Sequence, residues 1–339
     1  MKGSLIMKKI LVLLLSVSLL LISFSGCNTT DNPLTTNTNT ADNQTVEQEP
    51  NPESDFEYEE NDKGGISIVS YLGTSENVVI PAFIGGIPVT QIRTPAFYTN
   101  ENITSVTIPD SVNFIGHDSF ANCTALKDVV LSANLITIEA FAFENCSSLS
   151  NIELPESLTF IGYRAFANCT SLKHITIPQN SLNENSGECF ADSGLESVVL
   201  QEGIAVIPAS AFLRTKIEEI VLPSTVKNIE YGGLATGCLK SVRLNEGLEI
   251  IEMTAFSSNP LTEIVIPKTV VSCSEYSFTD CENLKAIKFE GDAPKDFLCE
   301  SDLLNEIFAQ SPVNFTIFYH QEAQGFTSPT WNGYKTALW

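Results

Sequence analysis

The chain has 339 residues, with 41 acidic side chains against 18 basic ones and a formal net charge of −23. Nucleic-acid binding depends on clustered Lys and Arg, so this balance excludes a nucleic-acid partner from our expectations. Hydrophobic residues make up 43% of the chain and aromatic residues 9%, which is enough to bury a substantial core.

Residues 1–26 are typical of a secretory signal, with a basic start and an apolar run over 10–22 that is short for a membrane span. Phe24-Ser25-Gly26-Cys27 resembles the lipobox of bacterial lipoproteins. The resemblance implies cleavage before Cys27, lipidation of this cysteine, and a chain held on the outer side of the cell membrane by its lipid alone. An ordinary secretion signal with an incidental cysteine is the alternative.

Residues 27–55 contain almost no apolar side chains and are rich in Asn, Thr, Pro and acids. Such a segment cannot bury enough surface to order itself, so we expect a disordered tether with a reach of about 25–30 Å.

The folded part begins with residues 56–102. Two short alternating runs around Lys63-Gly64-Gly65 predict a hairpin, and an irregular first repeat follows, as expected for an N-terminal cap.

A repeat of 22 or 23 residues fills 103–291, and Leu149–Thr170 shows it most clearly as L-x-x-I-x-L-P-x-x-L-x-x-I-G-x-x-A-F-x-x-C. The leading apolar residue recurs at Ile103, Leu126, Leu149, Leu172, Leu195, Ile217, Leu239, Leu261 and Leu284. This period lies in the range of leucine-rich repeats, which stack into solenoids. We therefore predict a β-rich solenoid of about nine repeats, each with one parallel strand, and a cap at both ends.

Alternation of Ile152 and Leu154 places the strand of this repeat, and Pro155 ends it. Ile161 and Phe166 then point inward. Cysteines recur at one late position, namely Cys123, Cys146, Cys169 and Cys281, where stacked coils lie about 4.8 Å apart. We interpret them as small buried hydrophobic residues, with disulfides between coils as the alternative.

Three repeats depart from the pattern. The repeat from Leu172 has an extra residue, Leu234 replaces the phenylalanine beside two glycines, and Cys273 replaces the inward isoleucine. Relaxed drift in a tolerant core and a functional bulge both account for these departures.

Residues 292–339 predict a C-terminal cap with a helix around Asp302–Gln310, a strand at Phe315–Tyr319 and an aromatic tail. Its Trp331, Tyr334 and Trp339 would cover the open core or form a binding patch.

The repeat resembles the BspA-type leucine-rich repeat, also called the Treponema pallidum type. The resemblance rests on Ile108-Pro109, Ile115-Gly116, Ala165-Phe166 and Asn168-Cys169. It implies a bacterial surface protein that binds other proteins in adhesion, an analogy at the level of the fold.

No catalytic motif stands out. His117, His174 and His320 lie outside any H-E-x-x-H motif, and G-x-S-x-G, phosphate-binding glycine loops and calcium loops are missing from the sequence. We therefore expect no enzyme, no cofactor and no metal site.

Outward strand positions are the remaining candidates for function, and we name the side that they form the strand face. The column between the inward strand residues is Thr107, Val130, Glu153, Thr176, Val199, Val221, Arg243, Val265 and Lys288. Its four valines suit either exposed strands or a partner surface. A protein on a host or neighbouring cell is the leading expected partner. A glycan stacking on Trp331 and Tyr334, or a structural envelope role without a ligand, are the alternatives.

Overall fold

The computed structural model describes residues 49–274, 276–294 and 315–339. The predicted signal, Cys27, the tether up to residue 48 and the predicted helix around Asp302–Gln310 lie outside the described residues. Within the described ranges, no helix has the length and apolar character needed to cross a membrane.

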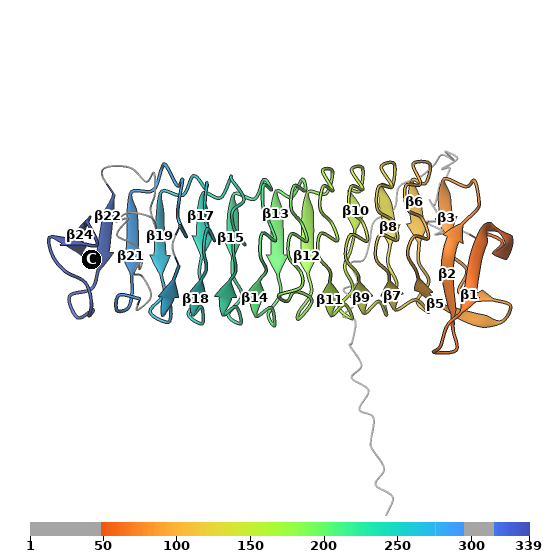
Figure 1. Cartoon of the computed structure of the whole chain (residues 1–339), viewed down its shortest axis with the longest axis horizontal. Helices are drawn as coiled ribbons and strands as arrows, with labels where there is room; N and C mark the ends of the chain where they lie inside the picture. Colours follow the sequence, from red (N-terminus) through yellow and green to blue (C-terminus); the bar gives the residue numbers. More distant parts are fainter. Residues whose placement is uncertain (1–48, 275, 295–314) are drawn as a thin grey trace, which may run out of the picture. The chain divides into compact units, whose positions relative to one another are not determined.

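The repeats form coils that stack in chain order as a parallel solenoid, which confirms the predicted fold class (Figure 1). Each coil contributes a first strand on the strand face. These strands are β3(Asn77–Val79), β6(Ser105–Thr107), β8(Asp128–Val130), β10(Asn151–Ile152), β12(His174–Ile177), β13(Ser197–Leu200), β15(Glu219–Val221), β17(Ser241–Arg243), β19(Glu263–Ile266) and β21(Ala286–Phe289).

Most coils also contain a second strand, so the prediction of one strand per repeat was incomplete. The second strands are β5(Ile87–Ile92), β7(Phe114–Ile115), β9(Thr137–Ile138), β11(Phe160–Ile161), β14(Val206–Ile207), β16(Asn228–Ile229), β18(Ile250–Ile251) and β20(Ser272–Cys273). They form because the inward isoleucine and the residue before it pair with the same two positions of a neighbouring coil, as Phe160 and Ile161 do with Thr137 and Ile138 of the preceding coil.

The first strands keep the register of the repeat, since Val106 of β6 lies opposite Val129 of β8. Their ladder is nevertheless divided. The strands β3, β6, β8 and β10 form one sheet, β12 pairs only with β13, and β15 pairs only with β17. A five-stranded sheet then begins at β19. The strand face is therefore interrupted after β10, after β13 and after β17.

Stacked phenylalanine rings fill the centre of the solenoid. The centroids of Phe97 and Phe120 are 4.7 Å apart, those of Phe143 and Phe166 are 5.3 Å apart, and those of Phe190 and Phe212 are 5.9 Å apart. Leu234 interrupts this column, which resumes with Phe256 and Phe278. Burial of apolar area along this column, where Leu234 is buried in place of a ring, is the main stabilising term of the fold.

The repeat cysteines are buried and unbridged, in agreement with their interpretation as small core residues. The structure adds a polar role, because each thiol donates to the carbonyl oxygen of the phenylalanine in the preceding coil. Cys123 Sγ lies 3.0 Å from the oxygen of Phe97, and Cys169 Sγ lies 3.2 Å from that of Phe143. Burial raises the pKa of the Cys123 thiol to about 12, so the thiol stays neutral.

The N-terminal cap contains the short 3-10 turn η1(Glu53–Asp55), the predicted hairpin of β1(Phe56–Glu60) and β2(Ile66–Tyr71), and β4(Phe83–Ile84). Asn51 exchanges two hydrogen bonds with Val79, one from each backbone N–H. Residues 51–55, which their composition assigned to the tether, are thus tied to the cap, because a few hydrogen bonds offset their lack of apolar surface.

The C-terminal cap contains β22(Thr316–Tyr319), which confirms the predicted strand, together with β23(Thr330–Trp331) and β24(Tyr334–Leu338). Trp331 is only 8% exposed and packs against Phe289 and Phe326, so it covers the core. Trp339 is 44% exposed and stacks on His320. The proposed sugar platform at Trp331 therefore lacks an open ring.

Candidate functional site: a groove on the strand face

The structure places the predicted strand-face column on the outside of the first strands. Val130, Val199 and Val221 are 60%, 58% and 63% exposed, Glu153, Thr176 and Arg243 are exposed, and Thr107, Val265 and Lys288 are half-buried. Register brings Thr107 beside Val130, Thr176 beside Val199, and Val221 beside Arg243. The breaks in the ladder divide these residues, so the column is a series of short patches.

A groove of about 590 Å³ lies across β15, β17 and β19, where the ladder is broken between β17 and β19. Three column residues, Val221, Arg243 and Val265, line it. We call this the Arg243 groove. Its floor is formed by Val242 and Leu244, which are half-buried although they hold inward positions of the repeat. In the coil before, the corresponding Ile220 and Leu222 are buried.

Arg243 differs from the other three arginines of the chain. Arg93 pairs with Glu59, Arg164 with Glu144 and Glu188, and Arg214 with Asp192. Arg243 makes no ion pair with any described residue, and its register neighbour Val221 is apolar. A free guanidinium on an apolar surface has its donors available for an external acceptor.

Glu246 and Glu290 also line this groove. Burial raises the pKa of the Glu290 carboxyl, and a hydrogen bond with Glu246 together with the charge of that residue adds to the rise. Two carboxyls this close disfavour each other's charged form, and the charges of His320 and Lys268 oppose part of this rise in the pKa of Glu290.

Asn245 shapes this end of the groove. It stands at the position where the neighbouring coils have Pro223 and Pro267, and its Nδ2 donates to the carbonyl oxygens of Ser224 and Val226 at 3.1 Å and 2.9 Å. The amide thereby ties the end of β17 to the preceding coil. Ser132 and Gln201 replace the same proline in other coils, so the exchange alone does not predict a groove.

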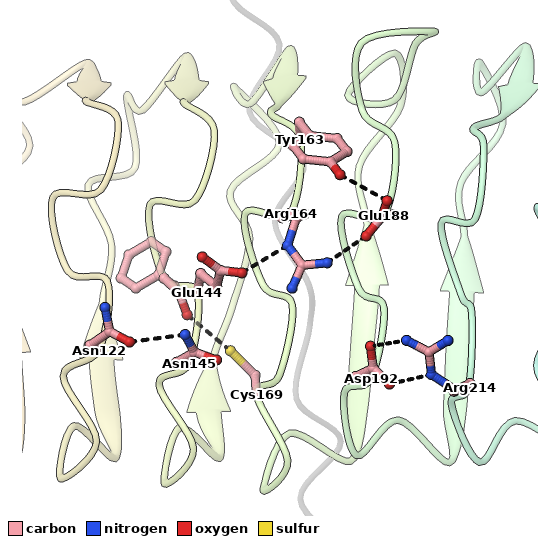
Figure 2. A network of polar contacts seen from close by, with 10 residues as sticks. Asn122, Glu144, Asn145, Tyr163, Arg164, Cys169, Glu188, Asp192 and Arg214 are labelled. Carbon is pink, nitrogen blue, oxygen red and sulfur yellow. Dashed lines mark hydrogen bonds and ion pairs between the residues drawn. The ribbon is translucent and has the colours of Figure 1, made fainter.

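A second polar surface lies on the turns beside the phenylalanine column (Figure 2). Arg164 reaches Glu144 and Glu188 in the coils on either side, and Tyr163 donates to Glu188 at 2.8 Å. The Arg214 guanidinium makes two hydrogen bonds of 2.6 Å with Asp192 and lowers the pKa of that carboxyl. These positions vary between repeats, so the repeat pattern did not predict these contacts.

A known family of repeats matches most of the described coils. Residues 90–216 and 205–314 match the model of the BspA type Leucine rich repeat region, and together they cover more than half of the chain. The chain belongs to this family. This BspA-type chain matches no curated protein.

Solved structures resemble this BspA-type chain over most of its length. A leucine-rich repeat protein from Bacteroides ovatus is 21% identical, with a TM-score of 0.61 over 78% of this chain and 70% of that one. A leucine rich cell surface protein from Faecalibacterium prausnitzii is 22% identical, with a TM-score of 0.54 over 86% and 94%. The T. pallidum leucine rich repeat protein is 27% identical, with a TM-score of 0.48 over 70% and 91%. The first two show the same fold.

The two surfaces of this BspA-type chain offer different chemistry. On the turns, the charges of Arg164 and Arg214 are already neutralised by their own carboxylates. In the Arg243 groove, apolar surface, a free cation and a carboxyl pair lie together. Among the described residues, no three His, Cys, Asp or Glu side chains are grouped as metal ligands. The arrangement in the groove suits non-covalent recognition of a ligand that carries both charges.

Proposed function

We propose that this BspA-type chain is a lipid-anchored protein on the outer side of a bacterial cell membrane, where it binds another protein through its strand face. The lipobox at Cys27 and the polar segment that follows it support the anchor. The single observation that carries the binding role is the Arg243 groove, where an arginine that has no ion partner among the described residues and half-buried apolar side chains line one hollow. Arginine in an apolar setting is typical of residues that dominate protein interfaces.

The exposed valines of the strand face extend this surface along the solenoid. Val130 and Val199 are each more than half exposed, although they lie on different sheets. Exposed apolar side chains lose water when a partner covers them, at about 25 cal/mol for each Å² of apolar area buried. The partner that fits is a protein on a host or neighbouring cell.

Capture of surface proteins with the purified chain tests the binding role. We expect Val199→Asp, Val221→Asp, Arg243→Glu and Lys288→Glu each to weaken a captured partner. Asp62→Asn in the N-terminal cap serves as the control, because it changes a charge far along the chain from the groove. Unchanged capture by all four variants would contradict the strand-face assignment.

Metabolic labelling with radioactive palmitate tests the anchor. We expect label in the unaltered chain and none in Cys27→Ser, which should also leave the membrane fraction. Equal labelling of both chains would show that Cys27 is not the lipidated residue.

A further inference from the structure

The Arg243 groove is lined by apolar side chains and by charges of both signs. Val242 and Leu244 are half-buried, Arg243 belongs to the same outward column as Val221 and Val265, and Glu246 and Glu290 supply two carboxyls. At about 590 Å³ it has the volume of a ligand pocket and accepts a few side chains rather than a folded domain.

This surface lies beside a break in the strand ladder. No strand pairing joins β17 to β19, and Val242 in β17 and Leu244 just after it are half-buried. Val242 differs in this from Ile220 and Ile264, which hold the same position in the coils on either side and are buried. An occupant that covers them completes the burial that the solenoid itself leaves unfinished.

The charges of both signs restrict the occupant further. A free guanidinium between valines fits a carboxylate, which it can bind with two parallel hydrogen bonds. The protein as a whole carries a formal charge of −23, so a purely acidic ligand would be repelled at long range. A basic group beside Glu246 and Glu290 offsets that repulsion and relieves the crowding of the two carboxyls.

We infer that the Arg243 groove binds an extended segment of a partner protein, with an acidic side chain on Arg243, apolar side chains on Val242 and Leu244, and a basic side chain at Glu246 and Glu290. This inference rests on the proposed protein-binding role and adds the chemistry of the bound segment. An extended chain fits because successive side chains point to opposite sides and a branched apolar residue can enter the floor.

Selection of short random peptides against the purified full chain tests the inference directly. We expect the enriched peptides to combine Asp or Glu, a branched apolar residue and Lys or Arg. Arg243→Gln should weaken a synthetic peptide of this kind at least about tenfold, the loss expected for charge-assisted hydrogen bonds. Arg243→Lys should retain part of the affinity, because it keeps the charge and loses the planar fork.

The proposed contact of a basic side chain with Glu246 and Glu290 has its own test. Replacing the basic residue of the peptide by Gln should weaken binding to the unaltered chain but not to the double variant Glu246→Gln, Glu290→Gln. Arg93→Gln is the matched control, since it removes an arginine from the N-terminal cap. Enriched peptides without an acidic residue, or equal binding to the unaltered chain and to Arg243→Gln, would overturn the inference.

The same variants separate this inference from the proposed function. If Val130→Asp and Val199→Asp abolish capture of a surface protein while Arg243→Gln does not, the strand face binds a protein and the groove assignment is wrong. If a glycan array binds the chain through Arg243 and no peptide does, the groove holds a sugar and the peptide segment is excluded. Because Arg243 is exposed, its substitution should leave the thermal unfolding midpoint unchanged, which excludes misfolding as the cause of lost binding.

Discussion

The coils of residues 103–171 and those of residues 195–290 have the same repeat, but the first set follows it regularly and the second set departs from it. In the first region the repeat keeps 23 residues, the rings of Phe120, Phe143 and Phe166 stack without interruption, and the strands β6, β8 and β10 share a sheet. In the second region three successive steps have 22 residues, Leu234 breaks the ring column, and the strand ladder is divided after β13 and after β17.

The irregular region is where the strand face is hollowed. The Arg243 groove lies at the break after β17, and a second groove of about 540 Å³, lined by Glu196, Ser197, Lys216, Glu218 and Glu219, lies at the break after β13. Both regions expose apolar side chains on the strand face, such as Val130 and Val221, but only in the second region do they lie beside a hollow. The departures at Leu234 and Cys273 lie in the coils on either side of β17, and drift and function both remain interpretations of them.

The largest effect that distinguishes the two regions is expected from the ring column. Phe143→Ala removes a fully buried ring that stacks between Phe120 and Phe166, and it should cost about 3–5 kcal/mol in the free energy of unfolding. Urea unfolding followed by circular dichroism measures this loss. Tyr58→Ala, at an exposed cap residue, is the control and should change the free energy by less than about 0.5 kcal/mol. A loss below about 1 kcal/mol for Phe143→Ala would show that the column is not continuous in solution.

A smaller effect is expected where the second region replaces a cysteine by Asn259. Its buried amide donates to the carbonyl oxygens of Leu234 and Phe256 and accepts from Thr236, Gly237 and Leu239. Asn259→Ala leaves several buried groups unpaired and should cost about 2–4 kcal/mol, since each such group costs about 1–3 kcal/mol.

Cys146→Ala is the matched change in the regular region, because its thiol makes one weak hydrogen bond to Phe120. It should cost about 1 kcal/mol. Equal losses for Asn259→Ala and Cys146→Ala, measured by urea unfolding, would show that the amide does no more than the thiol.

The buried thiols predict a loss of stability at alkaline pH. Burial raises the pKa of the Cys123 and Cys281 thiols from 9.0 to about 12, while the unfolded chain ionises near the ordinary value. The unfolded state therefore releases protons first, and the free energy of unfolding should fall as the pH rises from about 9 to 12. Urea unfolding at pH 8 and pH 10.5 measures the fall. The double variant Cys123→Ala, Cys281→Ala should show a shallower fall, and an identical slope would contradict the assignment.

The sequence predicted the column of Phe143, the buried role of Cys169 and the outward position of Val221, because each follows from a fixed period and a residue type. The breaks in the ladder were not predictable in this way. Strand pairing depends on how far neighbouring backbones are displaced, and no single residue type records that displacement. The exchange of proline for Asn245 does not mark the groove by itself, because Ser132 and Gln201 replace the same proline in other repeats. The pairing of Arg164 with Glu144 and Glu188 was also hidden, because it joins positions that the repeat leaves variable.

The smallest effects separate the paired arginine of the turns from the free one in the groove. Arg164→Gln removes two ion pairs, with Glu144 and Glu188, in which the arginine side chain is about four-fifths buried. It leaves these two carboxylates without a cation between them. We expect a loss of about 1 kcal/mol, near the upper end for partly exposed pairs, and a smaller loss at high salt. Arg243→Gln breaks no ion pair and should change the free energy of unfolding by less than about 0.5 kcal/mol at any salt concentration. Thermal unfolding of both variants at low and high salt makes the comparison. If Arg243→Gln destabilised the chain as much as Arg164→Gln, its guanidinium would have a structural partner, and the groove would lose the free charge on which its recognition of a carboxylate depends.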